Sequence, residues 1–278
     1  MLTPPRSEAS ATTSVARAAS DDYLDFCEGV RRACGIDLAQ YKRGQMERRV
    51  RTFVGRRGAP DLAAYLKTLR ADPDELASFL DRVTINVSQL WRNPEQWTAL
   101  ERVVLPELGA QSRRLRAWSA GCSYGAEAFT LAALARQVLP QASVQITGTD
   151  IDARIVARAR TGRFDVQDAR DAPKSMLRRF FTQEDDGTWT AGEDLRKLVR
   201  FEQGDLLRLG RRQEAYDLVL CRNTVIYFNE DVRDALHARL AASLRPGGYL
   251  VVGATERIAD PAALGLSGPL PFTYRKDA

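Results

Sequence analysis

The segment from Arg116 to Ala133 constrains the fold more than any other part of the chain. It reads RAWSAGCSYGAEAFTLAA: a short apolar run, a turn that contains Gly121 and Gly125, and then residues that favour a helix. Glycine lets the backbone approach a ligand closely, and the free N–H groups of the helix N-terminus face the same turn. This order of strand, turn and helix is typical of nucleotide-cofactor folds, although an ordinary strand–helix connection has the same pattern.

Strand-like and helix-like segments alternate along the chain on both sides of this turn. Such alternation predicts an α/β fold with a mainly parallel sheet and helices on both of its faces. The predicted strands are Leu115–Ser119, Val144–Thr149, Val199–Glu202, Asp217–Cys221, Tyr249–Val252 and Phe272–Arg275. The predicted helices are Trp97–Pro106, Glu127–Val138, one through Ile155, Val156 and Ala159, and Asp231–Leu244. An insertion at about 180–200 contains Asp-Asp-Gly, which predicts a β-hairpin in a small inserted β-subdomain.

Polar residues lie at the ends of four of the predicted strands. They are the glycine turn at 121–127, Asp150, Asp205, and the pair Arg222–Asn223. Ligands of parallel sheets bind at the carboxyl ends of the strands, so these groups are expected to line one crevice. Asp150 follows the turn by about 25 residues, the spacing at which an acidic residue accepts hydrogen bonds from ribose hydroxyls.

Two cofactors, NAD and S-adenosylmethionine (SAM), fit a ribose-binding carboxylate at this position. NAD also needs a cradle for its pyrophosphate at the helix N-terminus, where Glu127 would place a negative charge. SAM has no phosphate and carries a sulfonium and an ammonium group, which a nearby carboxylate favours. The glycine turn therefore favours SAM over NAD.

The part of the chain before the strands has a different character. Residues 1–20 are small, polar and proline-containing, and we predict a disordered tail. Residues 21–83 have helical periodicity in four segments and predict an all-α N-terminal domain. The polar and aromatic segment 84–97 is interpreted either as a lid over a ligand or as a linker whose Trp91 and Trp97 pack against both sides. Residues 98–278 form the predicted α/β domain.

Composition excludes several other kinds of protein. No apolar run is long enough to span a bilayer, and the four cysteines lack metal-site spacing, so we expect a cytoplasmic protein without a metal. The single histidine, His237, lies in a helical pattern and is predicted to be exposed or hydrogen-bonded. The net charge of +5 is concentrated in a basic stretch that suits an acidic partner: Arg31, Arg32, Lys42, Arg43, Arg48, Arg49, Arg51, Arg56 and Arg57.

Five motifs in order make the chain resemble the CheR-type chemoreceptor glutamate methyltransferases, from about Tyr23 to Arg275. They are TINVSQLWRNPEQW, WSAGCSYGAEAFTLA, GTDIDARIVARARTGRF, LCRNTVIYFN and LRPGGYLVVGATE. The second resembles the family's loop Ser-Ala-Gly-Cys-Ser-Thr-Gly-Glu-Glu-Pro-Tyr-Ser. The fourth resembles Cys-Arg-Asn-Val-Leu-Ile-Tyr-Phe almost residue for residue. The N-terminal ACGIDLAQYKRGQMERRVR also resembles the family's helical domain.

This resemblance implies a Rossmann-like SAM-dependent methyltransferase that forms methyl esters on glutamates of chemoreceptor helices. It also implies a role for each matching residue. Asn86, Ser88 and Arg92 would cover the cofactor, Ala120 and Glu127 would belong to its loop, and Asp150 would bind the ribose. Asp205 and Leu206 would flank the adenine, Arg222 and Asn223 would close the crevice, and Arg92 and Tyr227 would lie near the transferred methyl.

Some positions depart from the family pattern. Ser88 stands where Thr is usual, Asp205 where Asn is common, Leu90-Trp91 replaces an aromatic pair, and GATE lacks the usual His. Ala126 and Ala128 replace a Glu and a Pro of the loop. These changes keep open an alternative, a SAM-sensing or partner-docking module with little catalysis. A nucleic-acid methyltransferase is a third reading that no motif supports.

The partners follow from charge and from the resemblance. The basic residues Arg48, Arg49 and Arg51 would complement acidic receptor helices. The inserted hairpin is short and acidic at its tip, so we predict that no receptor C-terminal pentapeptide is bound. We further expect a monomer that neither inserts into membranes nor binds nucleic acid.

Overall fold

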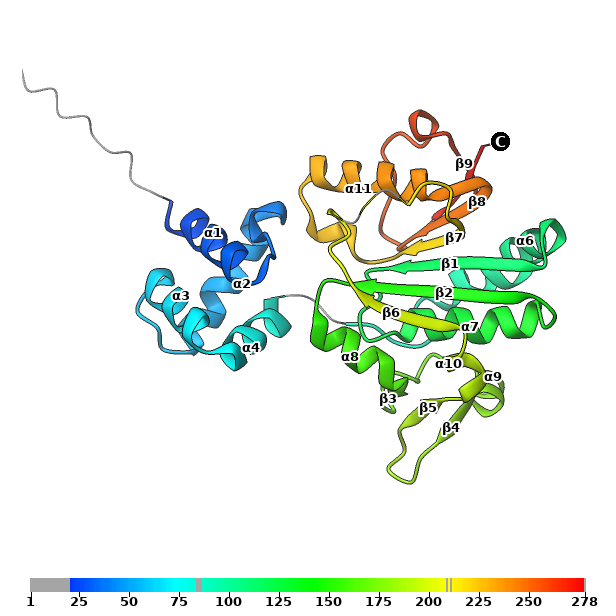
Figure 1. Ribbon diagram of the computed structural model, residues 1–278, viewed down its shortest axis with the longest axis horizontal. Helices are drawn as coiled ribbons and strands as arrows, with labels where there is room; N and C mark the ends of the chain where they lie inside the picture. Colours follow the sequence, from blue (N-terminus) through cyan, green and yellow to red (C-terminus); the bar gives the residue numbers. More distant parts are fainter. Residues whose placement is uncertain (1–20, 84–86, 209, 211, 278) are drawn as a thin grey trace, which may run out of the picture.

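The computed structural model describes residues 21–83, 87–208, 210 and 212–277 (Figure 1). The predicted tail at 1–20 and the predicted site residue Asn86 lie outside these ranges. A helical part and a larger part built on a sheet lie side by side in the molecule (Figure 1). Within the described ranges, no helix combines the length and the apolar character needed to cross a membrane.

The helical part confirms the four predicted helices: α1 (Asp22–Cys34), α2 (Arg43–Arg56), α3 (Leu62–Ala71) and α4 (Pro73–Val83). Asp21 caps α1 by accepting the backbone N–H groups of Tyr23 and Leu24, and Gly35 ends it with φ of +83°. The core of this part is aromatic, with the ring of Phe79 packed edge-on against Phe26, Phe53 and Tyr65. Such contacts add to the stability that burial of the rings provides.

The main sheet has the strand order β6-β2-β1-β7-β8-β10-β9. Its strands are β6 (Val199–Gln203), β2 (Ser143–Asp150), β1 (Arg114–Ala120), β7 (Tyr216–Cys221), β8 (Leu244–Val252), β10 (Thr273–Lys276) and β9 (Leu266–Leu270). The first five strands of this order are parallel, as predicted, and the last two pair antiparallel. The sequence did not indicate β9, because it contains Gly268 and Pro269, and proline is tolerated in a strand chiefly at a sheet edge.

Helices cover both faces of this sheet, as predicted (Figure 1). On one face α6 (Leu105–Gln111), α7 (Ala126–Val138) and α8 (Ala153–Thr161) contact β1, β2 and β6, and on the other α11 (Glu230–Ser243) contacts β8. The described part of the connection from β6 to β7 contains turns but no helix. On the α11 side β1, β2 and β6 therefore keep exposed polar residues, among them Arg116, Gln145 and Arg200.

The helix predicted at Trp97–Pro106 is longer at both ends. It starts as α5 (Pro94–Ala99), continues as a π-helical segment (Leu100–Val104) and ends as α6 at Gln111. Proline in a regular helix would lose a hydrogen bond and clash with the preceding turn. Here Pro106 lies in the first turn of α6, after a wider turn in which the N–H of Leu105 bonds to the carbonyl of Leu100.

The insertion forms a second, three-stranded sheet with the order β3-β5-β4. The predicted hairpin is present as β4 (Phe181–Gln183) and β5 (Trp189–Ala191). The short strand β3 (Arg163–Phe164) and the helices α9 (Lys174–Phe180) and α10 (Glu193–Arg196) complete it and were not predicted. Figure 1 shows this subdomain projecting from the α8 side of the main sheet.

A second connection joins the helical part to the sheet part, in addition to the chain itself. The backbone N–H of Lys42 donates to the carbonyl of Tyr227 over 2.8 Å. Asn229 donates from its backbone N–H to the carbonyl of Gln40 and from Nδ2 to that of Ala39, each over 3.0 Å. Next to these bonds, the rings of Tyr41 and Phe228 lie 4.9 Å apart. The segment at 38–42 therefore pairs directly with the segment at 227–229.

The environment of His237 differs from both predicted alternatives. The side chain is 1% exposed on α11, and neither ring nitrogen has a hydrogen-bond partner among the described residues. Burial disfavours the charged form and lowers the pKa of His237 to about 4. The prediction was wrong because a helical pattern does not show which helix face the rest of the fold covers.

This burial predicts a pH-dependent stability. The folded-state pKa of His237 lies below the unfolded value of about 6.5, so the unfolded state binds the proton more strongly. The free energy of unfolding therefore decreases as the pH is lowered through about 6.5. Between pH 7.5 and 5.5 His237 should remove about 1 kcal/mol from the free energy of unfolding. We expect urea titrations to show this loss in the wild type and not in His237→Leu. Equal pH dependence in the two proteins would contradict the assignment.

Candidate functional site

A cleft opens at the carboxyl ends of β1, β2 and β7 and encloses about 1100 Å³, part of which is open to solvent. Residues of the helical part close one side of it: Ile36, Asp37, Gln40 and Tyr41. Nine of the eleven predicted site residues line the cleft: Ser88, Arg92, Glu127, Asp150, Asp205, Leu206, Arg222, Asn223 and Tyr227. Ala120 does not line it, because its side chain is buried in the core between the sheet and α11.

The glycine turn is held against the ends of neighbouring strands. Gly121 has φ of +80°, and a Cβ there would lie 2.5 Å from Oγ1 of Thr224. Gly125 has φ of +88°, and a Cβ there would lie 2.8 Å from the ring of Phe201. The N–H groups of Gly121 and Cys122 both donate to the carbonyl of Thr149, over 2.9 and 3.0 Å. Glycine is thus required at both positions by conformation and by space.

Asp150 lies at the end of β2 and orders the same turn. One carboxylate oxygen accepts the backbone N–H of Ser123 over 2.8 Å, and the other accepts that of Asp152 over 3.1 Å. Burial raises the pKa of Asp150, and these two backbone hydrogen bonds act in the opposite direction. Each carboxylate oxygen can accept more than one hydrogen bond, so Asp150 can also accept from a ligand in the cleft.

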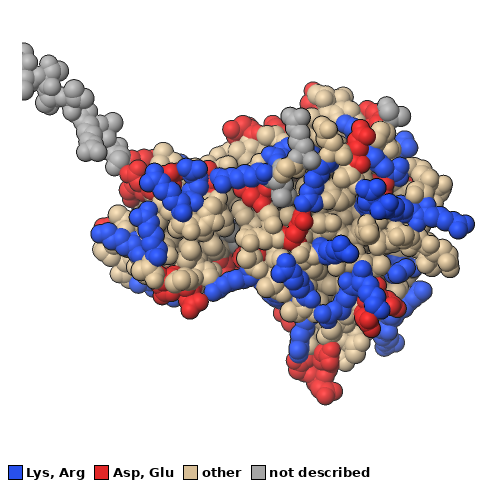
Figure 2. All heavy atoms as spheres, in the orientation of Figure 1, with Lys and Arg blue, Asp and Glu red and all other residues tan. Residues whose placement is uncertain are grey.

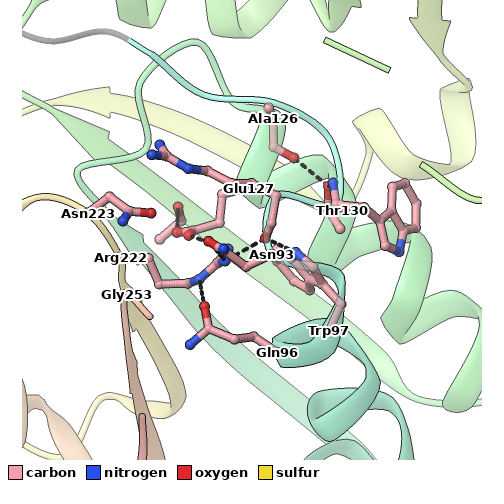
Figure 3. Close-up of polar contacts among 12 residues, drawn as sticks. Asn93, Gln96, Trp97, Ala126, Glu127, Thr130, Arg222, Asn223 and Gly253 are labelled. Carbon is pink, nitrogen blue, oxygen red and sulfur yellow. Dashed lines mark hydrogen bonds and ion pairs between the residues drawn. The ribbon is translucent and has the colours of Figure 1, made fainter. Parts of the chain in front are cut away.

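The floor of the cleft contains a buried ion pair between Glu127 and Arg222 (Figure 3). Glu127 lies in the first turn of α7, where Oε2 is 3.4 Å from the Arg222 guanidinium and Oε1 accepts the hydroxyl of Ser119 over 2.7 Å. Burial raises the pKa of Glu127 and lowers that of Arg222, and the attraction between the two charges opposes both shifts. Each side chain therefore compensates the charge of the other.

Arg222 also binds the N-terminal end of α5. Its Nε donates to Oε1 of Gln96 over 2.9 Å, its Nη2 donates to the carbonyl of Arg92, and the guanidinium lies 5.1 Å from the ring centre of Trp97 (Figure 3). Gln96 in turn donates to the carbonyl of Val252 at the end of β8. No role for Gln96 was predicted from the sequence. Its one signal there is that it directly precedes Trp97.

A third carboxylate, that of Glu256, shapes the turn after β7. It is 2% exposed and accepts the backbone N–H groups of Asn223, Val225 and Gly253, over 2.9, 3.1 and 2.5 Å. These bonds hold Asn223 with φ of +58° at the edge of the cleft. Burial raises the pKa of Glu256, and the backbone hydrogen bonds oppose that shift. The sequence motif contained Glu256, but nothing in it indicated this role.

Residues 87–93, which we term the lid segment, form one wall of the cleft. Val87, Ser88, Gln89 and Arg92 line it. Trp91 has φ of +54° and donates its backbone N–H to the hydroxyl of Thr130 over 3.1 Å. Trp91 and Trp97 are both buried in the core of the sheet part, so the alternative that they pack against both sides of a linker is wrong.

The charges in the cleft favour a cationic ligand. Four carboxylates line it against two guanidinium groups: Asp37, Glu127, Asp150 and Asp205 against Arg92 and Arg222. Glu127 places its charge in the first turn of α7, where a phosphate would otherwise bind, so the site is unsuited to a pyrophosphate. In the described residues, no group of three or more His, Cys, Asp or Glu side chains could hold a metal ion.

The fold and this cleft define a class, the SAM-dependent methyltransferases. A sulfonium cofactor without phosphate fits a negative cleft with a carboxylate at the end of β2 and a glycine turn after β1. The chain belongs to the CheR methyltransferase family. The model of its SAM-binding domain matches residues 86–265, and the model of its all-alpha domain matches residues 21–84.

Relatives from several bacteria are similar over nearly the whole chain. A chemotaxis protein methyltransferase of Listeria monocytogenes is 36% identical over 256 residues, which are 92% of this chain and 97% of the relative. One of Listeria innocua is 35% identical with the same coverage. Chemotaxis protein methyltransferase 1 of Vibrio cholerae is 31% identical over 85% of this chain and 89% of the relative.

The ion pair predicts a specific loss of stability. Glu127→Gln leaves the Arg222 cation buried without a counter-charge and should lower the free energy of unfolding by about 3 kcal/mol. The double variant Glu127→Gln/Arg222→Met removes both charges and should cost at least about 1 kcal/mol less than the two single changes added together. Chemical unfolding of the four proteins without cofactor tests this, and strictly additive losses would contradict it.

Proposed function

We propose that the protein transfers the methyl group of SAM to glutamate side chains on the cytoplasmic helices of a chemoreceptor. The relatives described above are chemotaxis protein methyltransferases, which supports a role in chemotactic adaptation. The observation that carries the proposal is that Arg92 and Tyr227 line the same cleft as Glu127 and Asp150, with no histidine among the lining residues. Such a cleft offers groups that orient a carboxylate and no imidazole to serve as a general base.

Esterification of a glutamate needs no general base. A glutamate side chain is ionised at neutral pH, so one of its oxygens can act directly as the nucleophile. When bound, SAM supplies a methyl group that its sulfonium makes electrophilic. The new bond joins the glutamate oxygen to that methyl carbon as the carbon–sulfur bond breaks, and two opposite charges are neutralised. The protein has to align the reactants and exclude water.

The residues of the cleft divide this task. Asp150 would accept hydrogen bonds from ribose hydroxyls, and Asp205 and Leu206, which line the same cleft, would flank the adenine. Glu127 would attract the ammonium of the amino-acid end, and Arg222 and Asn223 would close that end. Ser88 belongs to the lid segment above. Arg92 and Tyr227 would hold the substrate carboxylate by hydrogen bonds, in which a guanidinium is especially effective.

Arg92 and Tyr227 provide the first test. With labelled SAM and receptor-containing membranes, the wild type should produce base-labile methyl esters on the receptor. We expect Arg92→Ala and Tyr227→Phe to lower the rate about 100-fold or more, because the carboxylate is no longer aligned. The exposed Arg102 supplies a matched control, and Arg102→Ala should keep full activity. Binding of SAM without any transfer would instead favour a SAM-sensing module.

A basic groove next to the cleft suits an acidic substrate helix. Its basic residues are Arg48, Arg49 and Arg56 of α2, Arg82 of α4 and Arg158 of α8, and its one acidic residue is Asp81. Val87 lines both the groove and the cleft, so a helix docked in the groove lies beside the cleft. Acidic receptor helices would be attracted to this groove.

The structure changes which arginines this proposal uses. Arg51, one of the three residues predicted from the sequence, is paired with Asp22 and Glu47, over 2.7 and 2.8 Å. Arg31 and Arg32 are both paired with Glu28. Figure 2 shows acidic side chains among the basic ones at this end of the molecule. Much of the basic stretch is thus neutralised locally, and Arg48, Arg49 and Arg56 are the arginines of α2 that line the groove.

Charge reversal in the groove is the second test. The triple variant R48E/R49E/R56E should lower the rate of receptor methylation at low salt at least about tenfold and leave the affinity for SAM unchanged, because the groove lies outside the cleft. The triple variant R31E/R32E/R70E changes the net charge equally on α1 and α3 and should retain most of the activity. If both variants lose activity equally, the groove is not the docking surface.

Other expectations from the sequence stay predictions. They are a cytoplasmic monomer, the absence of pentapeptide binding at the inserted hairpin, and the division into units at 21–83, 84–97 and 98–278.

A further inference from the structure

Tyr124 of the glycine turn points away from the cleft, to the rear of the lid segment. The side chain is 4% exposed and does not line the cleft. Its hydroxyl group contacts the carbonyl of Ser88 and donates to Oδ1 of Asp168 over 2.7 Å. A residue of the cofactor loop therefore reaches the backbone of the opposite wall.

Asp168 continues this connection on the far side. Its backbone carbonyl accepts the N–H of Leu90 over 2.9 Å, and its second carboxylate oxygen lies 3.4 Å from the Arg158 guanidinium. Arg158 in turn lies over the ring of Tyr124, 4.0 Å from its centre. Tyr124, Arg158 and Asp168, which we term the latch, thus join the glycine turn, α8 and the lid segment.

We propose that the latch positions the lid segment for catalysis, with Tyr124 as the positioning residue. The latch contacts the backbone of Ser88 and Leu90 on the side away from the cleft. These contacts hold Ser88 and Arg92 in position along the wall of the cleft. Only a long side chain makes these contacts, because a hydroxyl attached to Cβ would not reach as far as the one at the end of the Tyr124 ring.

Burial gives these contacts their strength. The hydroxyl of Tyr124 remains a neutral donor because burial raises its pKa. Without it, the buried carboxylate of Asp168 and the half-buried carbonyl of Ser88 would each lose a donor, and the loss at a buried group costs more than that of an exposed hydrogen bond. The lid segment would then have fewer contacts to hold it against the cleft.

The position of the latch also connects the two proposed binding surfaces. Arg158 and Val87 line the basic groove, and Val87 also lines the cleft. The latch therefore supports the wall that separates the groove from the cleft. A displacement of this wall would affect cofactor binding first and substrate placement second. This last step rests on the proposed function, whereas the effect on the cofactor does not.

The test compares Tyr124→Phe with Tyr249→Phe. The Tyr249→Phe variant also removes a hydroxyl contact to a carboxylate, that of Glu107, in the sheet part of the molecule and outside the cleft. We expect Tyr124→Phe to weaken SAM binding about tenfold in calorimetry and to speed hydrogen exchange of a peptide spanning 87–93 about tenfold. Tyr249→Phe should leave both unchanged. If Tyr124→Phe loses no more SAM affinity and lid protection than Tyr249→Phe, the proposal fails.

Two further measurements keep the outcome decisive. If Tyr124→Phe does not fold, Asp168→Asn keeps an acceptor and removes its charge. It should still speed lid exchange about threefold, and unchanged exchange would overturn the latch. Neither readout uses a receptor. A wild type that methylates no receptor would therefore refute the proposed substrate, and a shift in SAM affinity for Tyr124→Phe would still support the latch.

Discussion

The arrangement of the cleft depends on the buried ion pair between Glu127 and Arg222. A buried charge without compensation is costly, so each of these residues requires the other. Arg222 extends from the end of β7 and also binds Gln96 and the carbonyl of Arg92, which brings the beginning of α5 onto the floor of the cleft. Glu127 fixes the first turn of α7 below the glycine turn. One electrostatic requirement thus places a strand end, two helix starts and the lid segment relative to one another.

The sequence was sufficient for features that depend on local pattern. Alternating apolar segments predicted the parallel strands, and Asp150, Asp205 and Arg222 were found because they lie at or just beyond the ends of strands. It was insufficient where a contact joins distant parts of the chain. Arg222 and Gln96 are 126 positions apart, and Tyr124 and Asp168 are 44 apart. Tyr41 lines the cleft only because the helical part folds against the segment at 227–229. A local sequence pattern does not indicate contacts between residues so far apart along the chain.

The two surfaces on either side of Val87 have opposite charge. Carboxylates predominate in the cleft, and guanidinium groups predominate in the groove. A cationic cofactor and an acidic substrate helix would therefore be attracted to different places, and neither would compete for the site of the other. The neutralised arginines of α1 and α2 sharpen this separation, because their pairing with Glu28, Asp22 and Glu47 leaves the groove as the concentrated basic surface of α2.

The double attachment of the helical part has a geometric consequence. It is joined to the sheet part through the chain that leads into the lid segment and again where 38–42 pairs with 227–229. Two points of attachment prevent free rotation about one linker, so the groove keeps a constant separation from Tyr227. Successive turns of an α-helix advance by about 5.4 Å. A helix held in the groove would therefore present to the cleft only those side chains that lie at this separation along its axis. The position of a side chain along the docked helix would then decide whether it reaches the cleft.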